Sequence, residues 1–181
     1  MITSTDTRMH IAKCLNTLLK KKPIDRLSVV EVCQSAGVSR TTFYKYFQDI
    51  YSVPEWLWEY AFSDILGQIG LKYGWSEGHR VLFETMAELK ECVLYTESDR
   101  MTNSFLLKAN SLTLQIHTRN IEAKRGYPLT EQEAVELNYL SYMHASMTHK
   151  WISDGMRVSP ALMQKIIADL VPPLIADTLG R

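Results

Sequence analysis

The chain has 181 residues, of which 46% are hydrophobic and 22% are charged. These proportions are those of an ordinary folded protein, and they exclude a disordered or low-complexity chain. Twenty basic residues balance twenty acidic ones, which argues against a protein that coats nucleic acid with a uniformly basic surface. The length allows two modest domains.

Positive charge is concentrated in the first fifty residues. Eight basic side chains against four acidic ones give this segment a net charge of +4, and the remainder carries the balancing −4. The basic residues are Arg8, Lys13, Lys20, Lys21, Lys22, Arg26, Arg40 and Lys45. A basic head on an acidic body is typical of a DNA-facing module, although a solvated surface gives the same distribution.

The three cysteines are too widely spaced for a zinc or redox motif. Cys14, Cys33 and Cys92 are therefore predicted to be reduced, buried thiols. The N-terminal residues lack a positive start followed by an apolar core, and no window is apolar enough to cross a membrane. We expect a cytoplasmic protein, and the sequence indicates no cofactor.

Apolar residues recur at helical intervals along almost the whole chain, and this pattern predicts an all-α fold. The first helix is predicted over residues 7–21, where Ile11, Leu15 and Leu18 share one face. It ends near Pro23, whose ring disfavours helix in the residue before it.

Two short helices joined by a tight turn are predicted next. The first begins at Ser28, whose side chain forms a capping box with Glu31, and it ends at Gly37, which can adopt the left-handed conformation that closes a helix. Ser39 caps the second helix, predicted over residues 40–47. A supporting helix, a short turn and a second helix together make a helix-turn-helix.

The second of these helices has one apolar face and one polar face. At roughly 100° per residue, Phe43 and Phe47 lie together on the apolar face. Polar side chains lie around the opposite side, namely Thr41, Tyr44, Lys45 and Gln48. This polar face can enter a DNA major groove, which is about 12 Å wide.

Further helices are predicted for the body of the chain. They begin near residue 49 or 52 and then cover residues 77–95, 101–124 and 131–153, the last opened by a capping box of Thr130 with Glu133. A final helix is capped by Ser159 and carries a wide apolar stripe. Pro172 and Pro173 must bend or end it.

The helix-turn-helix segment resembles a known family. The resemblance to the signature of TetR-type repressors is carried by Leu27, Ser28, Ser35, Ala36, Gly37, Val38, Ser39, Thr42, Phe43, Tyr44, Tyr46 and Phe47. With Asp49, Tyr51 and Trp56, the segment is also similar to the branch that includes dihydroxyacetone-kinase regulators.

The resemblance implies a helix-turn-helix domain over residues 1–48 and a helical regulatory and dimerisation domain over residues 49–181. It implies a transcriptional repressor that responds to an unidentified small molecule and binds a palindromic DNA operator as a homodimer. Paired recognition helices must reach successive major grooves about 34 Å apart, so a small change in dimer geometry removes specific contacts. The apolar stripe of the final helix is a candidate dimer seam, or else ordinary core.

The resemblance also assigns DNA contacts. The predicted set is Ser28, Ser39, Arg40, Thr41, Thr42, Tyr44, Lys45 and Tyr46. Arg40, Thr41 and Lys45 are the candidates for base edges, because Arg can bond two acceptors of guanine and Thr can offer a methyl group to thymine. Ser28 is expected at a phosphate, where a helix N-terminus presents unpaired amides.

Thr42, Tyr44 and Tyr46 are expected to clamp the DNA backbone, although Tyr46 is as well suited to packing. The chain departs from the family pattern at Ile50, where relatives often carry Lys. We therefore expect one phosphate contact fewer.

The ligand pocket is harder to assign. Met143, His144, Met147 and Trp151 fall at helical spacing and would suit a semi-polar cavity, yet Met and aromatic stripes are more often simply core. His10 and Cys14, four residues apart, could supply two metal ligands but lack clear partners, so no metal site is predicted.

The sequence also bears on two other classes of function. The sequence contains no H-E-x-x-H, G-x-S-x-G, G-x-G-x-x-G or P-loop motif, and we predict that the protein is not an enzyme. The alternative is a helical interaction protein or co-regulator of TetR shape that does not read DNA directly. Ile50 and the zero net charge motivate this alternative.

Overall fold

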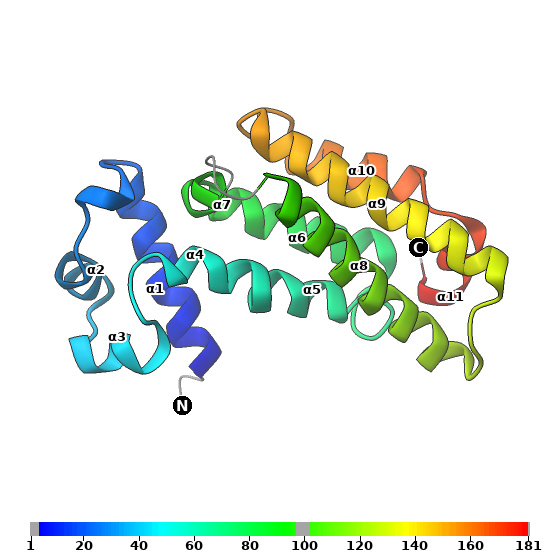
Figure 1. Cartoon of the computed structure of the whole chain (residues 1–181), viewed down its shortest axis with the longest axis horizontal. Coiled ribbons are helices and arrows are strands. Elements are labelled where there is room, and N and C mark those ends of the chain that lie inside the picture. The colour runs from blue at the N-terminus through cyan, green and yellow to red at the C-terminus, as the bar shows by residue number, and fades with distance from the viewer. Residues whose placement is uncertain (1–3, 97–101, 181) are drawn as a thin grey trace.

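The structure is a computed structural model that describes residues 4–96 and 102–180. These residues form helices joined by turns, and their only β-type pairing is an isolated bridge between Ile69 and Tyr73. The predicted all-α fold is confirmed. Figure 1 shows a small N-terminal head beside an elongated helical body, with the C-terminal helix at the end of the body away from the head.

The head consists of α1 (Ser4–Leu19), the 3-10 turn η1 (Ile24–Arg26), α2 (Val29–Ala36) and α3 (Arg40–Tyr46). Helix α1 ends two residues earlier than predicted. Pro23 follows in an extended conformation, with φ of −63° and ψ of 156°, in agreement with its role as a helix terminator.

The predicted caps of α2 and α3 are confirmed. Ser28 and Glu31 form the full capping box, and Gly37 ends α2 in the left-handed conformation with φ of 62°. The side chain of Ser39 then accepts a hydrogen bond from the Thr42 amide at 3.0 Å. These local bonds fix the turn between the two helices.

A long helical arm leads from the head into the body. It consists of α4 (Ser52–Trp56), a π-helical segment η2 (Leu57–Phe62) and α5 (Ser63–Gly67). We predicted a regular helix here, and the π-helical turn is the difference. Such segments are rare inside helices and are frequent at functional sites.

The helix predicted over residues 77–95 is in fact two helices, α6 (Trp75–Glu88) and α7 (Lys90–Thr96). The break lies at Leu89, which is fully buried and has φ of −101° and ψ of 28°. Asn16 of α1 stabilises it, because its side-chain oxygen accepts from the amides of Glu91 and Cys92 at 2.8 and 3.1 Å. A tertiary contact therefore ends α6 and caps α7.

The remaining helices are α8 (Thr102–Arg125), α9 (Glu131–Ser153), α10 (Pro160–Asp169) and α11 (Pro173–Leu179). The bounds of α9 and its Thr130 capping box are those predicted, whereas Met101, the predicted start of α8, lies outside the described residues. The final helix ends before the two prolines, and Pro173 opens α11.

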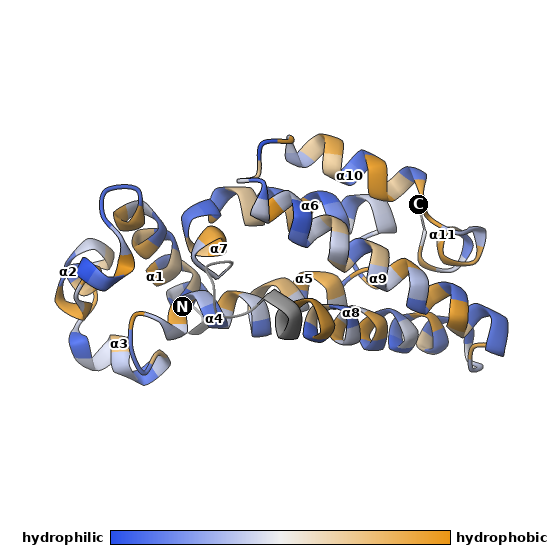
Figure 2. Cartoon of the chain, turned by 45° about the horizontal axis from the view of Figure 1, so that its top comes forward, coloured by the Kyte–Doolittle hydropathy of each residue, from blue (hydrophilic) through white to orange (hydrophobic). Residues whose placement is uncertain are grey.

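Hydrophobic and hydrophilic residues are interspersed along the helices, as the orange and blue segments in Figure 2 show. The buried apolar residues form a cluster that runs from Ile11 in the head to Leu179 in the body. The cluster contains residues on both sides of the predicted domain boundary between residues 48 and 49. The division of the chain into two domains at that point stays a prediction. No described helix has the length and apolar character needed to cross a membrane.

Candidate nucleic-acid interface

The outer face of α3 is polar and open. Its apolar face is anchored, since Phe43 is fully buried and Phe47 is 3% exposed. The Phe47 ring packs against Trp56 of α4 with centroids 6.0 Å apart. On the outer side the exposed residues are Arg40, Thr41, Tyr44 and Lys45. The structure therefore brings these four predicted residues to one accessible surface.

Ser39 and Thr42 lie at the N-terminus of α3 and are used by the helix itself. In addition to the bond from the Thr42 amide, the two hydroxyls lie 2.9 Å apart. Ser39 is exposed and Thr42 is partly buried. These two residues orient the first turn of α3. The first amides of a helix lack partners within the helix, and such an end can bind an anion.

Ser28 is exposed, but its hydroxyl is also engaged in a helix cap. It donates to the Glu31 carboxylate at 2.9 Å and accepts from the Glu31 amide at 3.3 Å. Lys22 pairs with the same carboxylate at 2.5 Å. Hydrogen bonds from Lys22 and Ser28 lower the pKa of Glu31, so this carboxylate remains charged beside the predicted phosphate contact.

Tyr46 points into the head rather than lying fully on its surface. It is partly buried, and the Arg8 guanidinium lies 5.4 Å from its ring centroid while the Lys45 ammonium lies 5.5 Å from it. Arg8 also lies 5.9 Å from the Trp56 ring. Of the two predicted roles of Tyr46, these contacts favour packing. Sequence reasoning missed Arg8 here, because it is 38 residues away and has no motif around it.

Three further residues of the head have structural roles. Ile50 is 6% exposed and belongs to the core, so its apolar side chain has a structural role at this position. The ring nitrogen Nε2 of His10 forms a hydrogen bond with the Ala36 carbonyl at 3.0 Å, and the Cys14 thiol donates to the Ser35 carbonyl at 3.5 Å. Both side chains thus bind the end of α2.

The cysteines are free thiols. Cys33 and Cys92 are buried as predicted, whereas Cys14 is only partly buried. Burial raises the pKa of Cys33, and it raises the pKa of Cys92 to about 12.

The body contains a cavity of about 350 Å³. Its walls come from the π-helical arm, α6, α8 and α9, and it is mainly apolar with several polar groups. Trp58 and Ser63 show how the arm is shaped here: the Trp58 indole donates to Thr96 of α7 at 2.9 Å, and the Ser63 hydroxyl donates to the Trp58 carbonyl at 3.0 Å. Such a hollow is the usual form of a small-molecule site.

The four predicted pocket residues do not come together. His144 lines the cavity, whereas Met147 and Trp151 line a separate groove and Met143 lines neither hollow. The reason is helical geometry, because residues 143, 147 and 151 share a face that is rotated from that of His144 by one residue, or roughly 100°. Trp151 has a structural role, since its indole donates to the Val158 carbonyl at 2.8 Å.

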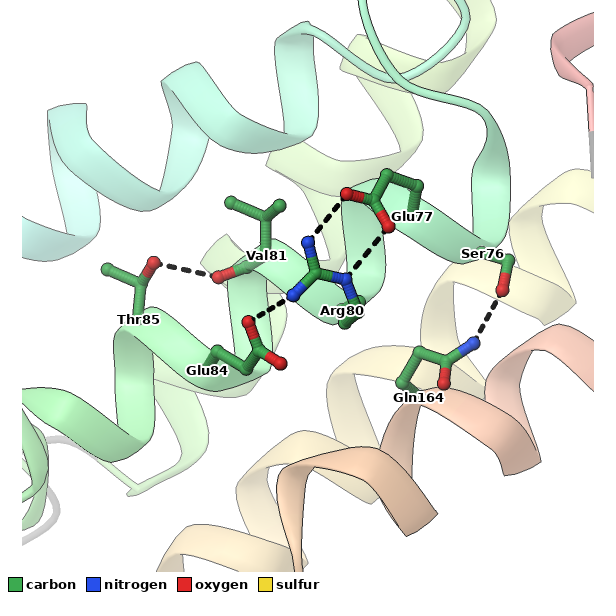
Figure 3. A network of polar contacts seen from close by, with 7 residues as sticks. All are labelled: Ser76, Glu77, Arg80, Val81, Glu84, Thr85 and Gln164. Atoms are coloured by element: carbon green, nitrogen blue, oxygen red, sulfur yellow. Dashed lines mark hydrogen bonds and ion pairs between the residues drawn. The ribbon is translucent and has the colours of Figure 1, made fainter.

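Helix α6 supplies several residues of the cavity wall, and its other side carries an internal ion-pair network and one hydrogen bond from α10. Figure 3 shows Arg80 bonded to both Glu77 and Glu84, and the Gln164 amide of α10 bonded to the Ser76 hydroxyl. On the inner side His79 is 2% exposed. Burial lowers its pKa to about 4, so its ring is neutral at neutral pH.

The cavity wall and the head meet at the break between α6 and α7. Besides its two acceptor bonds, Asn16 donates to the Glu88 carbonyl at 3.0 Å, and it is 4% exposed. Lys13 of α1 pairs with the Glu88 side chain at 2.7 Å on the surface. Helix α1, which packs against α2, is thereby bonded to α6 and α7, and both of these helices contribute residues to the cavity lining.

Two parts of the chain match families of known proteins. Residues 16–52 match the family described as bacterial regulatory proteins, tetR family, and residues 74–172 match the transcriptional regulator C-terminal region of TetR proteins. The chain belongs to the TetR family of transcriptional regulators. These TetR matches describe regulatory proteins and not enzymes.

Two relatives of this TetR-family protein extend the comparison. Over 82 residues it is 30% identical to the HTH-type dhaKLM operon transcriptional activator DhaS of Lactococcus lactis subsp. lactis (strain IL1403); the match spans 45% of this chain and 44% of that protein. The structure called dihydroxyacetone kinase operon activator DhaS superposes with a TM-score of 0.70 at 23% identity, covering 95% and 96% of the two chains. The predicted similarity to dihydroxyacetone-kinase regulators agrees with the sequence match, and the superposition shows the shared fold.

A second solved structure shows the same fold. A TetR-family transcriptional regulator from Syntrophomonas wolfei str. Goettingen superposes with a TM-score of 0.56 at 19% identity, covering 92% of this chain and 93% of that one.

Proposed function

We propose that this TetR-family regulator binds operator DNA as a homodimer, with α3 in the major groove. The observation that carries the proposal is the two-sided character of α3, in which Phe43 and Phe47 are buried while Arg40, Tyr44 and Lys45 face outward. The excess of four positive charges in the first fifty residues supports it, because phosphate attraction supplies much of the affinity for DNA.

The proposed contacts divide into two kinds. We assign Arg40, Thr41 and Lys45 to base edges, and Tyr44, which is 50% exposed, to the DNA backbone. We assign Ser28, Ser39 and Thr42 to phosphates. Tyr46 belongs to the set predicted from the sequence, and its contacts with Arg8 and Lys45 favour a packing role. A protein of this kind works where the chromosome is, and we propose a cytoplasmic location on that ground.

The homodimer is proposed to form through α9 and α10. Val135, Tyr139 and Tyr142 of α9 lie at helical spacing and are 49%, 70% and 48% exposed. Leu162 and Leu170 of α10 are exposed to a similar extent, at 48% and 49%. Large apolar side chains that gather on exposed helix faces typically mark a protein interface, and a second copy would present a second α3 to a palindromic operator.

The cavity is proposed as the site of a small-molecule effector. Its walls include residues of α6 and α7, and these helices are bonded to α1 through Asn16. A ligand that binds one arrangement of α6 and α7 better than another would shift the position of the head by mass action. The domain division at residues 48 and 49 is retained as part of this proposal.

The sequence predicts that the protein represses transcription, whereas the relative DhaS is named a transcriptional activator. We propose ligand-responsive control, with repression as the direction. A reporter gene placed behind the operator tests the direction. Deleting the regulator raises expression if it represses and lowers expression if it activates.

Direct binding tests the proposal. A fluorescently labelled intergenic fragment next to the gene is titrated with purified protein, and Lys45→Ala is compared with Lys124→Ala. Both lysines are exposed, and Lys124 lies in the last turn of α8 in the body. We expect Lys45→Ala to weaken binding severalfold and Lys124→Ala to leave it unchanged. Equal affinities for the two variants would contradict the assignment of α3.

The alternative function is that of an interaction protein that keeps the TetR shape without reading DNA. The engagement of the Ser28 hydroxyl by Glu31 and the burial of Ile50 are the observations that favour it. A folded dimer that shifts no fragment at low salt would support this alternative.

A further inference from the structure

Three buried histidines from three different helices meet in the body. His79 lies on α6, His117 on α8 and His144 on α9, and the three side chains are 2%, 0% and 4% exposed. Each ring offers one nitrogen, and these three nitrogens all lie within 4.8 Å of one another. Buried polar side chains normally have hydrogen-bond partners, so a cluster of three imidazoles requires an explanation.

Among the described residues, hydrogen bonding accounts for one of the six ring nitrogens of this cluster. Nδ1 of His79 lies 2.8 Å from the Trp75 carbonyl and can donate to it. In the part of the chain that the structure describes, neither nitrogen of His117 and neither nitrogen of His144 has a partner. The Nε2 atom of His79 and at least one nitrogen on each of the other two rings are therefore available to a ligand.

Packing explains where the rings lie but not why they are histidines. The Trp75 ring contacts all three, with centroid separations of 4.4 Å to His79, 5.0 Å to His117 and 5.2 Å to His144. An apolar side chain would make the same stacking contacts without placing an unpartnered polar atom in the core. Burial lowers the pKa of His117 to about 3 and that of His144 below its ordinary value, which leaves neutral rings with free lone pairs.

The arrangement has the features of a three-histidine metal centre. Zinc binds imidazole nitrogen at about 2.0–2.1 Å, and catalytic zinc sites use three protein ligands and leave the fourth position open. The bond from His79 Nδ1 to a backbone carbonyl is the usual way in which a ligating histidine is oriented. Small rotations of the rings would bring nitrogens that lie within 4.8 Å to the spacing of one tetrahedral ion.

The donor set also indicates the class of metal. No carboxylate belongs to the cluster formed by these described residues, and imidazole donors suit zinc, copper and nickel rather than magnesium or calcium. His79 and His144 both line the 350 Å³ cavity, as does Thr113, one turn before His117 on α8. A metal held here would therefore have its open position toward the cavity.

We propose that His79, His117 and His144 bind one divalent transition-metal ion of the zinc class at the wall of the body cavity. The fourth ligand is a water molecule or an oxygen atom of a small molecule in the cavity. Metal binding itself does not depend on the proposed DNA-binding function. A metal ion or a metal-bound ligand in the cavity is also expected to change operator affinity. This second expectation rests on the proposed function.

Cobalt is the probe for the first test. The full-length protein is treated with a chelator, dialysed and titrated with Co²⁺, and visible absorption reports tetrahedral coordination. We expect one Co²⁺ per chain with intense visible bands that Zn²⁺ displaces. Absence of these bands in a folded protein, or binding of Zn²⁺ weaker than about 10 μM in competition with a chromophoric chelator, overturns the proposal.

Substitution identifies the ligands. His117→Gln and His144→Phe are compared with His149→Gln, a cavity-lining histidine outside the cluster. We expect the first two variants to lose at least a hundredfold in Zn²⁺ affinity and the third to match the wild type. Retention of wild-type affinity in either cluster variant overturns the assignment. Should these variants fail to fold, the rise in the wild-type melting temperature with Zn²⁺ decides the matter, because absence of that rise also overturns it.

Operator binding is measured separately with and without Zn²⁺. Loss of the Co²⁺ spectrum refutes the metal site whatever the operator data show. An intact spectrum in a protein that binds no DNA refutes only the proposed regulatory function.

Discussion

The bonds of Asn16 join the head to the body, and their removal has a calculable effect. In Asn16→Ala the amides of Glu91 and Cys92 lose their acceptor and the Glu88 carbonyl loses its donor. Asn16 is 4% exposed, so water replaces these bonds only in part. A buried polar group left unpaired costs about 1–3 kcal/mol. With partial rescue by water, we expect a loss of roughly 2–4 kcal/mol in the free energy of unfolding.

Urea denaturation followed by circular dichroism measures this loss, and the melting temperature should fall by about 2–4 °C for each kcal/mol in a chain of this size. Lys13→Ala is the control, because it removes the surface ion pair between Lys13 and Glu88, whose side chains are 47% and 56% exposed. Such pairs contribute about 0–1 kcal/mol. If Asn16→Ala is no more destabilising than Lys13→Ala, Asn16 does not hold the break between α6 and α7.

Three other predictions follow from local chemistry. Ser39→Ala removes the side-chain cap of α3, and it should lower the free energy of unfolding by about 1 kcal/mol and weaken operator binding. Ser159→Ala removes the corresponding cap of α10 and should lower stability alone. Equal operator affinities of the two variants would contradict this prediction. Brief alkylation followed by mass spectrometry should modify the partly buried Cys14 first and Cys92 last, since burial raises the pKa of Cys92 to about 12, and early labelling of Cys92 would disprove it. The pKa of Glu31 is lowered by hydrogen bonds from Lys22 and Ser28, so the stability they add is present above the ordinary value of 4.5 and is lost as the pH falls below it. Glu31→Gln should therefore show a flatter decline of unfolding free energy from pH 6 to pH 3, and an unchanged decline would argue against the capping box.

The parts of the fold that the sequence predicts are those determined by neighbouring residues. The capping boxes at Ser28 and Thr130 and the left-handed Gly37 involve residues within four positions of one another, and the structure has each of them. The buried side of α3 follows from the spacing of Phe43 and Phe47 for the same reason.

The parts that escaped prediction depend on distant residues. The break at Leu89 is stabilised by Asn16, more than seventy positions earlier in the chain, as the separations of 72 and 75 residues in its hydrogen bonds show. His79 and His117 were missed because only the packing of α6, α8 and α9 brings them to His144. The one available signal was a histidine on an otherwise apolar helix face, which is more often simply core.

Salt-dependent operator binding by the wild-type protein tests the central claim most directly. Anisotropy titrations of a labelled operator fragment are made between 50 and 300 mM salt, with the stoichiometry determined at high concentration. We expect two chains to bind each operator. The logarithm of the association constant should fall linearly with the logarithm of the salt concentration, with a slope of about −3 or steeper, because lysines and arginines that contact phosphates displace counterions. A folded protein that binds no fragment at the lowest salt, or binds with no dependence on salt, would contradict the account.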